Sequence, residues 1–199
     1  MKRLFLIVFL VLICVILVFY VFNKYNFNRD HYIGEKIDSL DGVYVHFNGG
    51  VNNVSERNLS PDGYNIGLKY QCVEFVKRYY LLHYNHKMPD SFGHAKDYFD
   101  ISIEDGQLNE KRNLIQFTNP SKQKPAVGDI VVFSASVFNM YGHVAIVADV
   151  KNDEIEIIQQ NPGTFGASRV SISLLEQNEL WQIDNSRVLG FLRMEIINN

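Results

Sequence analysis

The segment YQCVEFVKRYY, residues 70–80, carries the residue around which the whole chain is interpreted. Cys72 lies at the start of a helix that the spacing of apolar residues predicts from Gln71 to about His86. Unpaired backbone N–H groups and the positive end of the helix dipole favour a thiolate at such a position. Cys72 is therefore predicted to be a nucleophile, although a lone cysteine is also a common small buried residue.

A histidine opens the second segment that carries chemistry. Residues 141–147, YGHVAIV, predict a strand that begins near His143, and residues 154–160 predict the next strand, after a hairpin turn. The order of these residues matches papain-like catalysis, in which a cysteine on a helix is followed by a histidine on a strand and by an amide side chain on the next strand. A one-residue change in hairpin register would turn Gln160 instead of Gln159 toward His143. Gln159, Gln160 and Asn161 are therefore all candidates for the third catalytic residue.

The charge and composition of the chain exclude several classes of protein. A net charge of −3 without a basic stripe argues against nucleic acid as a partner, and Lys77 and Arg78 are predicted to be solvated. Glu74 is predicted to favour the helix dipole and to be structural. The scattered histidines, of which only His83 and His86 have helical spacing, give no metal site.

The N-terminus is dominated by an apolar run, residues 4–22, which is about the length needed to cross a bilayer. It follows a short basic tail (1–3), lacks the small residues of a cleavage site, and is predicted to be a retained signal-anchor. The flanking charges nearly balance, and the favoured topology is a single-pass protein of the cell membrane with an extracytoplasmic domain. Cys14 is predicted to be an apolar side chain of this span.

The remaining residues predict one domain, 37–199, after a polar tether, 23–36. A short helix is expected within 94–105, with Ala95, Tyr98 and Phe99 inward, and loops at 48–63 and 117–128. Helices first and strands after indicate an α+β domain with N-terminal helices packed on an antiparallel sheet. The strands are expected at 42–47, 129–134, 143–150, 154–160 and 188–197.

The sequences QCVEF (71–75) and GHVAI (142–146) resemble the CHAP family of cysteine, histidine-dependent amidohydrolases and peptidases. Within it, the similarity is greatest to the amidase domain of glutathionylspermidine synthetase/amidase, over roughly 43–161. The resemblance implies a papain-like CHAP fold, Cys72 as nucleophile and His143 as general base and then general acid. It places Gln159 where the family usually has Glu, Asp or Asn. A Gln oxygen can accept the Nδ1–H of His143 but cannot stabilise an imidazolium by charge.

The same resemblance and the helix position of Cys72 suggest how an oxyanion would be held. The backbone N–H of Cys72 is one expected donor, with the side chain of Gln71 or Tyr70 as a second, although Gln71 is alternatively a helix cap. Asn161 is a further expected contact to substrate. The predicted activity is amide hydrolysis through a thioester, with no metal or organic cofactor.

The predicted substrate depends on the side of the membrane that the domain faces. An outward domain would meet cell-wall peptides (peptidoglycan), and a cytoplasmic one a glutathionylspermidine-like amide. The alternative is a catalytically weak or inactive binding module tethered to the membrane, which the amide at residue 159 motivates.

Overall fold

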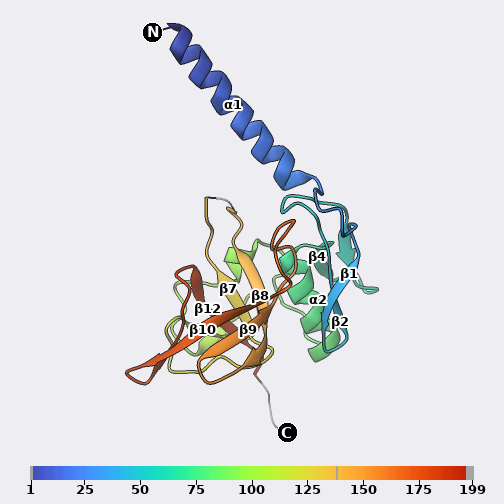
Figure 1. Cartoon of the computed structure of the whole chain (residues 1–199). Helices are drawn as coiled ribbons and strands as arrows, with labels where there is room; N and C mark the ends of the chain where they lie inside the picture. The colour runs from blue at the N-terminus through green and yellow to red at the C-terminus, as the bar shows by residue number, and fades with distance from the viewer. Residues whose placement is uncertain (1, 138, 196–199) are drawn as a thin grey trace.

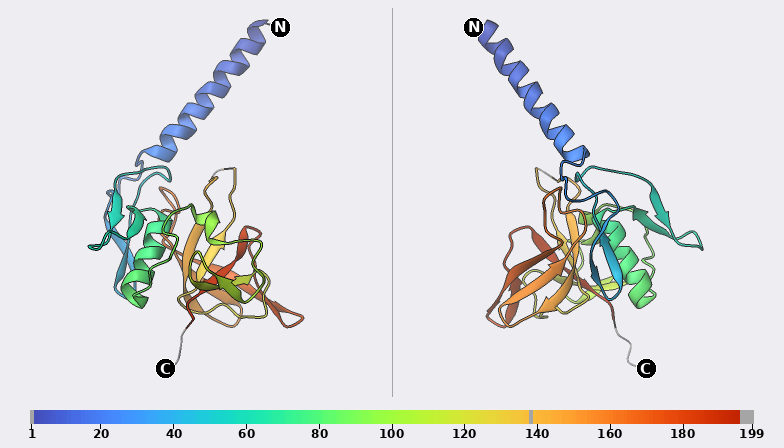
Figure 2. Two further views of the ribbon diagram at one scale, coloured as in Figure 1. Left: turned by 180° about the vertical axis from the view of Figure 1, so that it is seen from behind. Right: turned by 45° about the vertical axis from the view of Figure 1, so that its right-hand side comes forward.

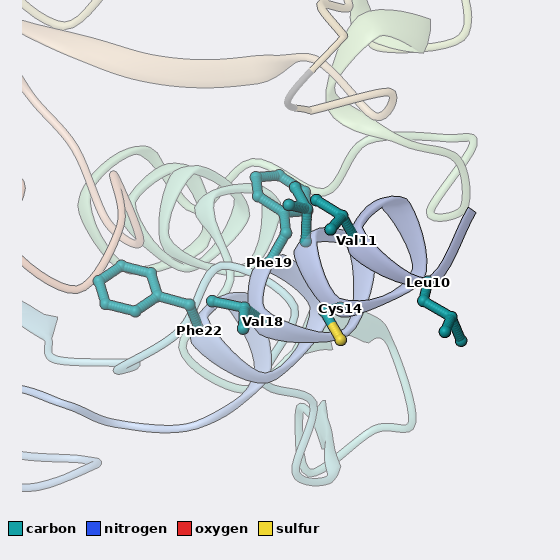
Figure 3. A pocket seen from close by; sticks show the side chains of 7 residues that line it. Leu10, Val11, Cys14, Val18, Phe19 and Phe22 are labelled. Carbon is teal, nitrogen blue, oxygen red and sulfur yellow. The ribbon is translucent and has the colours of Figure 1, made fainter. Parts of the chain in front are cut away.

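A long apolar helix, α1 (Lys2–Lys24), extends away from the rest of the molecule (Figure 1). The computed structural model describes residues 2–137 and 139–195. No residue of α1 is buried, and within the described ranges it is the one helix long and apolar enough to cross a membrane. A shallow cavity of about 580 Å³ along its surface is lined by apolar side chains and by Cys14 (Figure 3). The helix therefore has the length and surface of a bilayer span.

The centre of the molecule is an antiparallel sheet of eight strands in the order β11-β10-β9-β8-β7-β12-β6-β5. Its strands are short and rich in β-branched residues, as buried strands are. Their bounds are β5 (Gln107–Asn109), β6 (Leu114–Thr118), β7 (Ile130–Phe133), β8 (His143–Val150), β9 (Glu154–Ile158), β10 (Arg169–Gln177), β11 (Leu180–Ile183) and β12 (Val188–Arg193).

The sheet closes partly on itself. Edge strand β11 reaches across to the segment after β6 through a bridge between Ser121 and Trp181. Apolar side chains from β6 to β12 are thereby enclosed in a core of their own, with Val131, Ala145 and Phe191 among its buried members. This closure leaves the other face of the sheet for the helices.

The N-terminal half of the domain packs on that other face. Helix α2 (Cys72–Tyr84) lies between the large sheet and a small hairpin of β1 (Lys36–Leu40) and β2 (Val43–His46), as Figures 1 and 2 show. A second two-stranded unit, β3 (Arg57–Leu59) with β4 (Asn65–Leu68), also contacts α2. A 3₁₀ helix, η1 (Ala95–Tyr98), covers β7 and β8.

Strand β8 connects the two cores because its side chains alternate between the faces of the sheet. Val144 and Ile146 pack with the buried residues of α2, including Phe75. Ala145 and Val147 face the enclosed side of the sheet. The start of β8 thus lies beside the N-terminus of α2 at the junction of both cores.

One of two buried charged residues of α2 corrects the sequence interpretation. Lys77 is 1% exposed, although it was expected to be solvated, and its Nζ donates to the carbonyl oxygens of Asn65 and Ser91. Glu74 is also buried and pairs with Arg78 at 2.7 Å. Carbonyl oxygens of β4 and of Ser91 compensate the charge of Lys77, and Arg78 of the same helix compensates that of Glu74. The polar positions of the helix therefore do not mark its solvent face.

The α+β class and the antiparallel sheet agree with the sequence prediction, while the order of elements is more mixed. Strands β1 to β4 flank or precede α2, so helices do not simply come first. Strands β1, β4, β5, β6, β10 and β11 were not expected, and β3 lies inside a predicted loop. The predicted last strand is β12, and residues 196 and 197 of that prediction lie outside the described ranges. The segment 23–36 contacts the domain, for example through Asn28 to the Thr164 carbonyl at 3.2 Å.

Candidate active site

Cys72 occupies the first position of α2, behind a backbone turn that is set by the two preceding residues. Tyr70 has a positive φ of 66°, and Gln71 is the extended N-cap residue, with φ −84° and ψ 158°. The residue keeps some solvent exposure while its thiol is enclosed by the core around Val144. The chain therefore delivers a cysteine side chain to the boundary between α2 and β8.

Burial raises the pKa of the Cys72 thiol. The backbone N–H groups of Val144, Val73 and Cys72 itself lower it, but less than burial raises it. The N–H groups at the helix N-terminus thus favour the thiolate as expected, but desolvation of the charged form is the larger effect.

His143 begins β8 directly after a glycine that the backbone requires. Gly142 has a φ of +75°, and a Cβ there would lie 2.7 Å from the Phe133 carbonyl oxygen. The His143 ring packs against the Phe133 ring, with centroids 5.9 Å apart. The turn and the ring contact together fix the direction in which the imidazole projects.

Gln159, and not Gln160, contacts the imidazole. The distance between Nε2 of His143 and Oε1 of Gln159 is 2.8 Å, and the Gln159 amide donates from its own Nε2 to the Ala167 carbonyl at 3.0 Å. This second bond orients the amide so that its oxygen faces the ring. His143 accordingly donates from Nε2, and Nδ1 is its unprotonated nitrogen. The resemblance led us to expect Nδ1–H of His143 in this bond, and the structure has Nε2 there instead.

His143 is held neutral. Burial lowers its pKa to about 4, assisted by the charge of Arg187 and opposed by the bond to Gln159. Within the described residues no hydrogen bond joins the Cys72 thiol to the imidazole. Thiol and imidazole are both uncharged at neutral pH, so a proton transfer between them belongs to the reaction and not to the resting state.

Gln160 has a structural role on the other side of the strand. It is fully buried, accepts the His46 backbone N–H at 2.7 Å, and donates to the Gln71 carbonyl and to Glu74. These bonds tie β9 to β2 and to the start of α2. They leave Gln160 no contact with His143.

The side chains of the three other predicted site residues, Tyr70, Gln71 and Asn161, mainly contact neighbouring segments of the protein. Gln71 donates from Nε2 to the Asn53 carbonyl at 2.7 Å and makes no side-chain cap. Asn161 donates to Gln71 Oε1 at 2.8 Å, while its buried Oδ1 has no partner among the described residues. The Tyr70 ring packs on His46, 5.3 Å between centroids. Of the predicted oxyanion donors, the Gln71 amide is committed to a loop contact, whereas the backbone N–H of Cys72 and the Tyr70 hydroxyl have no such contact among the described residues.

A cleft of about 430 Å³ opens beside the imidazole. His143, Gln159 and Asn161 line it, and Cys72 does not. The last two turns of α1 contribute Phe19 and Asn23. Residues that sequence reasoning missed complete its wall. They are Val51, Phe133, Ser136, Asn139, Ile157, Pro162, Val170, Ile172, Asn185 and Arg187.

The described residues contain no group of three or more His, Cys, Asp or Glu side chains that could hold a metal ion. The parts that the fold does gather are an enclosed thiol at a helix N-terminus, a neutral imidazole and an amide that orients it. Such a set can perform nucleophilic acyl transfer.

A sequence profile of the CHAP domain matches residues 62–161, half of the 199-residue chain. Cys72, His143 and Gln159 all lie inside this range. The chain belongs to the CHAP domain family.

Curated relatives of this CHAP protein include enzymes that are much longer than it. Glutathionylspermidine synthase of Crithidia fasciculata is 29% identical over 143 residues, which are 65% of this chain and 19% of the relative. The bifunctional glutathionylspermidine synthetase/amidase of Escherichia coli (strain K12) is 31% identical over 107 residues, 53% of this chain and 17% of the relative. The chain thus spans less than a fifth of these relatives. Family and relatives together indicate a hydrolase of amide bonds.

Among solved structures, the crystal structure of Ly7917 is 27% identical to this CHAP protein where the two align. The alignment covers 37% of this chain and 30% of that chain, with a TM-score of 0.28.

Proposed function

We propose that this CHAP protein is a membrane-anchored cysteine amidase or peptidase. The observation that carries the proposal is the bond between His143 and Gln159, which leaves Nδ1 of a neutral imidazole available as a base beside the helix that presents Cys72. Membership of the CHAP family supports the reaction class.

The proposed reaction is an acyl transfer in two steps. Nδ1 of His143 takes the thiol proton as the Cys72 sulfur attacks the substrate carbonyl carbon, and the backbone N–H of Cys72 donates to the oxyanion. The imidazolium gives its proton to the leaving amine, the C–N bond breaks, and a thioester remains. Water, activated by the neutral imidazole, then releases the acid and restores the thiol.

Gln159 has an orienting role in this scheme. Its oxygen keeps the Nε2–H tautomer of His143, and its dipole partly stabilises the imidazolium that forms during each step. A carboxylate would stabilise that cation more strongly. In this scheme the proton therefore moves from the Cys72 thiol to His143 only in the complex with substrate.

Helix α1 is the proposed anchor, with the domain on the extracytoplasmic side, where peptides of the cell wall are the proposed substrates. A glutathionylspermidine-like amide becomes the substrate if the domain is cytoplasmic. A reporter fused after Asn199 tests this: activity of a phosphatase that works only outside the cytoplasm is expected, and activity of a cytoplasm-specific reporter would reverse the topology.

The direct test is a screen of peptide and polyamine amides with the full chain in detergent, comparing wild type with Cys72→Ala. Product release by wild type that the variant lacks is expected. Turnover that survives in the variant would remove Cys72 from the mechanism.

A tethered binding module is the second candidate, because the raised pKa of the Cys72 thiol and the missing thiol–imidazole bond are also features of a weak or inactive site. Peptide binding without turnover of any bound amide would favour it.

A further inference from the structure

Among the described residues the guanidinium of Arg187 has no carboxylate partner, unlike those of Arg78, Arg169 and Arg193. Its Nη2 donates to the Ser134 carbonyl at 2.9 Å, and its buried Nε has no hydrogen-bond partner among the described residues. Arg78 pairs with Glu74, Arg169 with Asp38 and Glu156, and Arg193 with Asp129. Arg112 also has no carboxylate partner, but it lies outside the cleft and donates to the carbonyl oxygens of Asp90, Phe92 and Asp97.

The surroundings of Arg187 make its missing carboxylate partner significant. Arg187 lines the cleft together with His143 and Gln159, and no Asp or Glu is among the described residues of the wall. Much of the remaining wall is apolar, with Ile157, Val170 and Ile172 as examples. An unpaired charge in such a place is costly unless a ligand pairs with it.

The position of Arg187 is fixed by the backbone. Its N–H donates to Asn185 Oδ1 at 3.0 Å, and its carbonyl accepts the Ser134 N–H at 2.7 Å. These bonds join the turn before β12 to the end of β7. The arginine is thus held in place before any ligand arrives, which reduces the entropic cost of binding.

We propose that Arg187 binds a carboxylate of the substrate and makes this site selective for peptides that carry an acidic group near the scissile amide. A guanidinium presents planar, parallel N–H donors that match the two oxygens of a carboxylate. This inference rests on the proposed amidase function and names the chemistry of its substrate.

Binding of a carboxylate there would also act on the base. The charge of Arg187 lowers the pKa of His143, so a carboxylate that neutralises it makes His143 a stronger base when an acidic substrate is present. Recognition and activation would then be coupled through one side chain.

The kinetic test uses matched pairs of short peptide amides in which glutamate is replaced by glutamine at each position in turn. Wild type is expected to prefer the glutamate member at one position by about tenfold to a hundredfold in kcat/KM. Arg187→Gln should lose that preference because its kcat/KM falls for the glutamate peptide and is unchanged for the glutamine peptide. Arg187→Lys should keep part of the preference. Lys122→Gln removes the same charge from an exposed residue outside the cleft and should change nothing.

A binding test separates this inference from the proposed function. The full chain with Cys72→Ala is titrated calorimetrically with the same peptide pairs, with and without Arg187→Gln. Carboxylate preference that depends on Arg187, without turnover by wild type, would leave the inference standing and remove the amidase. Equal affinity for both members at every position, or an equal loss for both in Arg187→Gln, would overturn the inference. Arg187→Lys provides the comparison if Arg187→Gln does not fold.

Discussion

The side-chain oxygen of Gln159 accepts a hydrogen bond from Nε2 of His143 at 2.8 Å, while the same amide donates to the Ala167 carbonyl. A neutral amide therefore contacts the imidazole at the position where the resemblance to the family leads one to expect Glu, Asp or Asn. Burial lowers the pKa of His143 to about 4, and the bond to the neutral amide does not offset this, so the imidazole is neutral at physiological pH. The predictions below depend on this difference.

Cys72→Ala is expected to abolish amide hydrolysis and to leave the fold intact, because alanine is well accommodated at the first position of a helix. The circular dichroism spectrum and the thermal midpoint should match wild type while kcat falls below detection. Cys14→Ser, which changes the thiol on α1, is the matched control and should retain full activity. Loss of activity in Cys14→Ser would contradict this assignment.

Gln159→Ala is expected to lower kcat/KM by about tenfold to a hundredfold, since the ring loses the bond that selects its tautomer. Gln160→Ala should instead lower the free energy of unfolding by about 1–3 kcal/mol, because it leaves buried partners unsatisfied. Kinetics and urea unfolding of the two variants measure this contrast. The reverse pattern would assign the orienting role to Gln160.

Gln159→Glu is expected to change the pH dependence of the reaction. His143 acts as a base only when unprotonated, so wild-type kcat/KM should fall as the pH drops through its pKa of about 4. A carboxylate at residue 159 raises that pKa, and the acid limb should move to higher pH. The variant also loses the donor to Ala167, which limits any gain in rate. An unmoved acid limb would show that another group controls it.

Alkylation of Cys72 by iodoacetamide is expected to be slow at pH 7 and to accelerate above the range of a free cysteine, about pH 8.5, because burial raises the thiol pKa. The measurement uses the Cys14→Ser variant, so that Cys72 is the one thiol that iodoacetamide can alkylate. His143→Ala should change the profile little, since the resting imidazole carries no charge. A fast plateau at pH 6–7 that His143→Ala removes would reveal a thiolate–imidazolium pair.

Lys77 should make stability depend on pH. Burial lowers its pKa from 10.5 to about 8 in the folded state, so between these values the unfolded chain binds more protons. The stabilisation therefore rises with pH through this window, by up to about 3 kcal/mol. The difference in unfolding free energy between wild type and Lys77→Met, measured in urea at pH 7.5 and 10, should show this rise. A constant difference would mean that Lys77 stays charged when folded.

Local patterns sufficed for the elements that bring the site together. Apolar spacing identified α1 and α2, and β-branched runs on both sides of a polar turn identified β8 and β9. The β8–β9 ladder contains a register shift between Val147 and Asp149, which no sequence pattern indicated. The choice between Gln159 and Gln160 therefore needed the structure.

Other features depend on partners far along the chain and could not be predicted. Lys77 is buried because its ammonium group donates to carbonyl oxygens of β4 and of the loop that contains Ser91. Arg187 reaches the cleft because its turn pairs with the end of β7. The thiol pKa depends on how deeply α2 is packed, which helix position alone does not determine.

The end of α1 is fastened to the domain by short contacts. The Asn23 carbonyl accepts the Asn52 N–H at 2.9 Å, a Cβ on Gly50 would lie 2.2 Å from that carbonyl oxygen, and the Phe22 and Phe165 rings are 6.2 Å apart. With α1 in a bilayer, the cleft would stay at a fixed height above the lipid surface. Encounter with substrate would then be two-dimensional, and the rate would follow the number of target amides per unit area of membrane instead of their concentration in bulk solution.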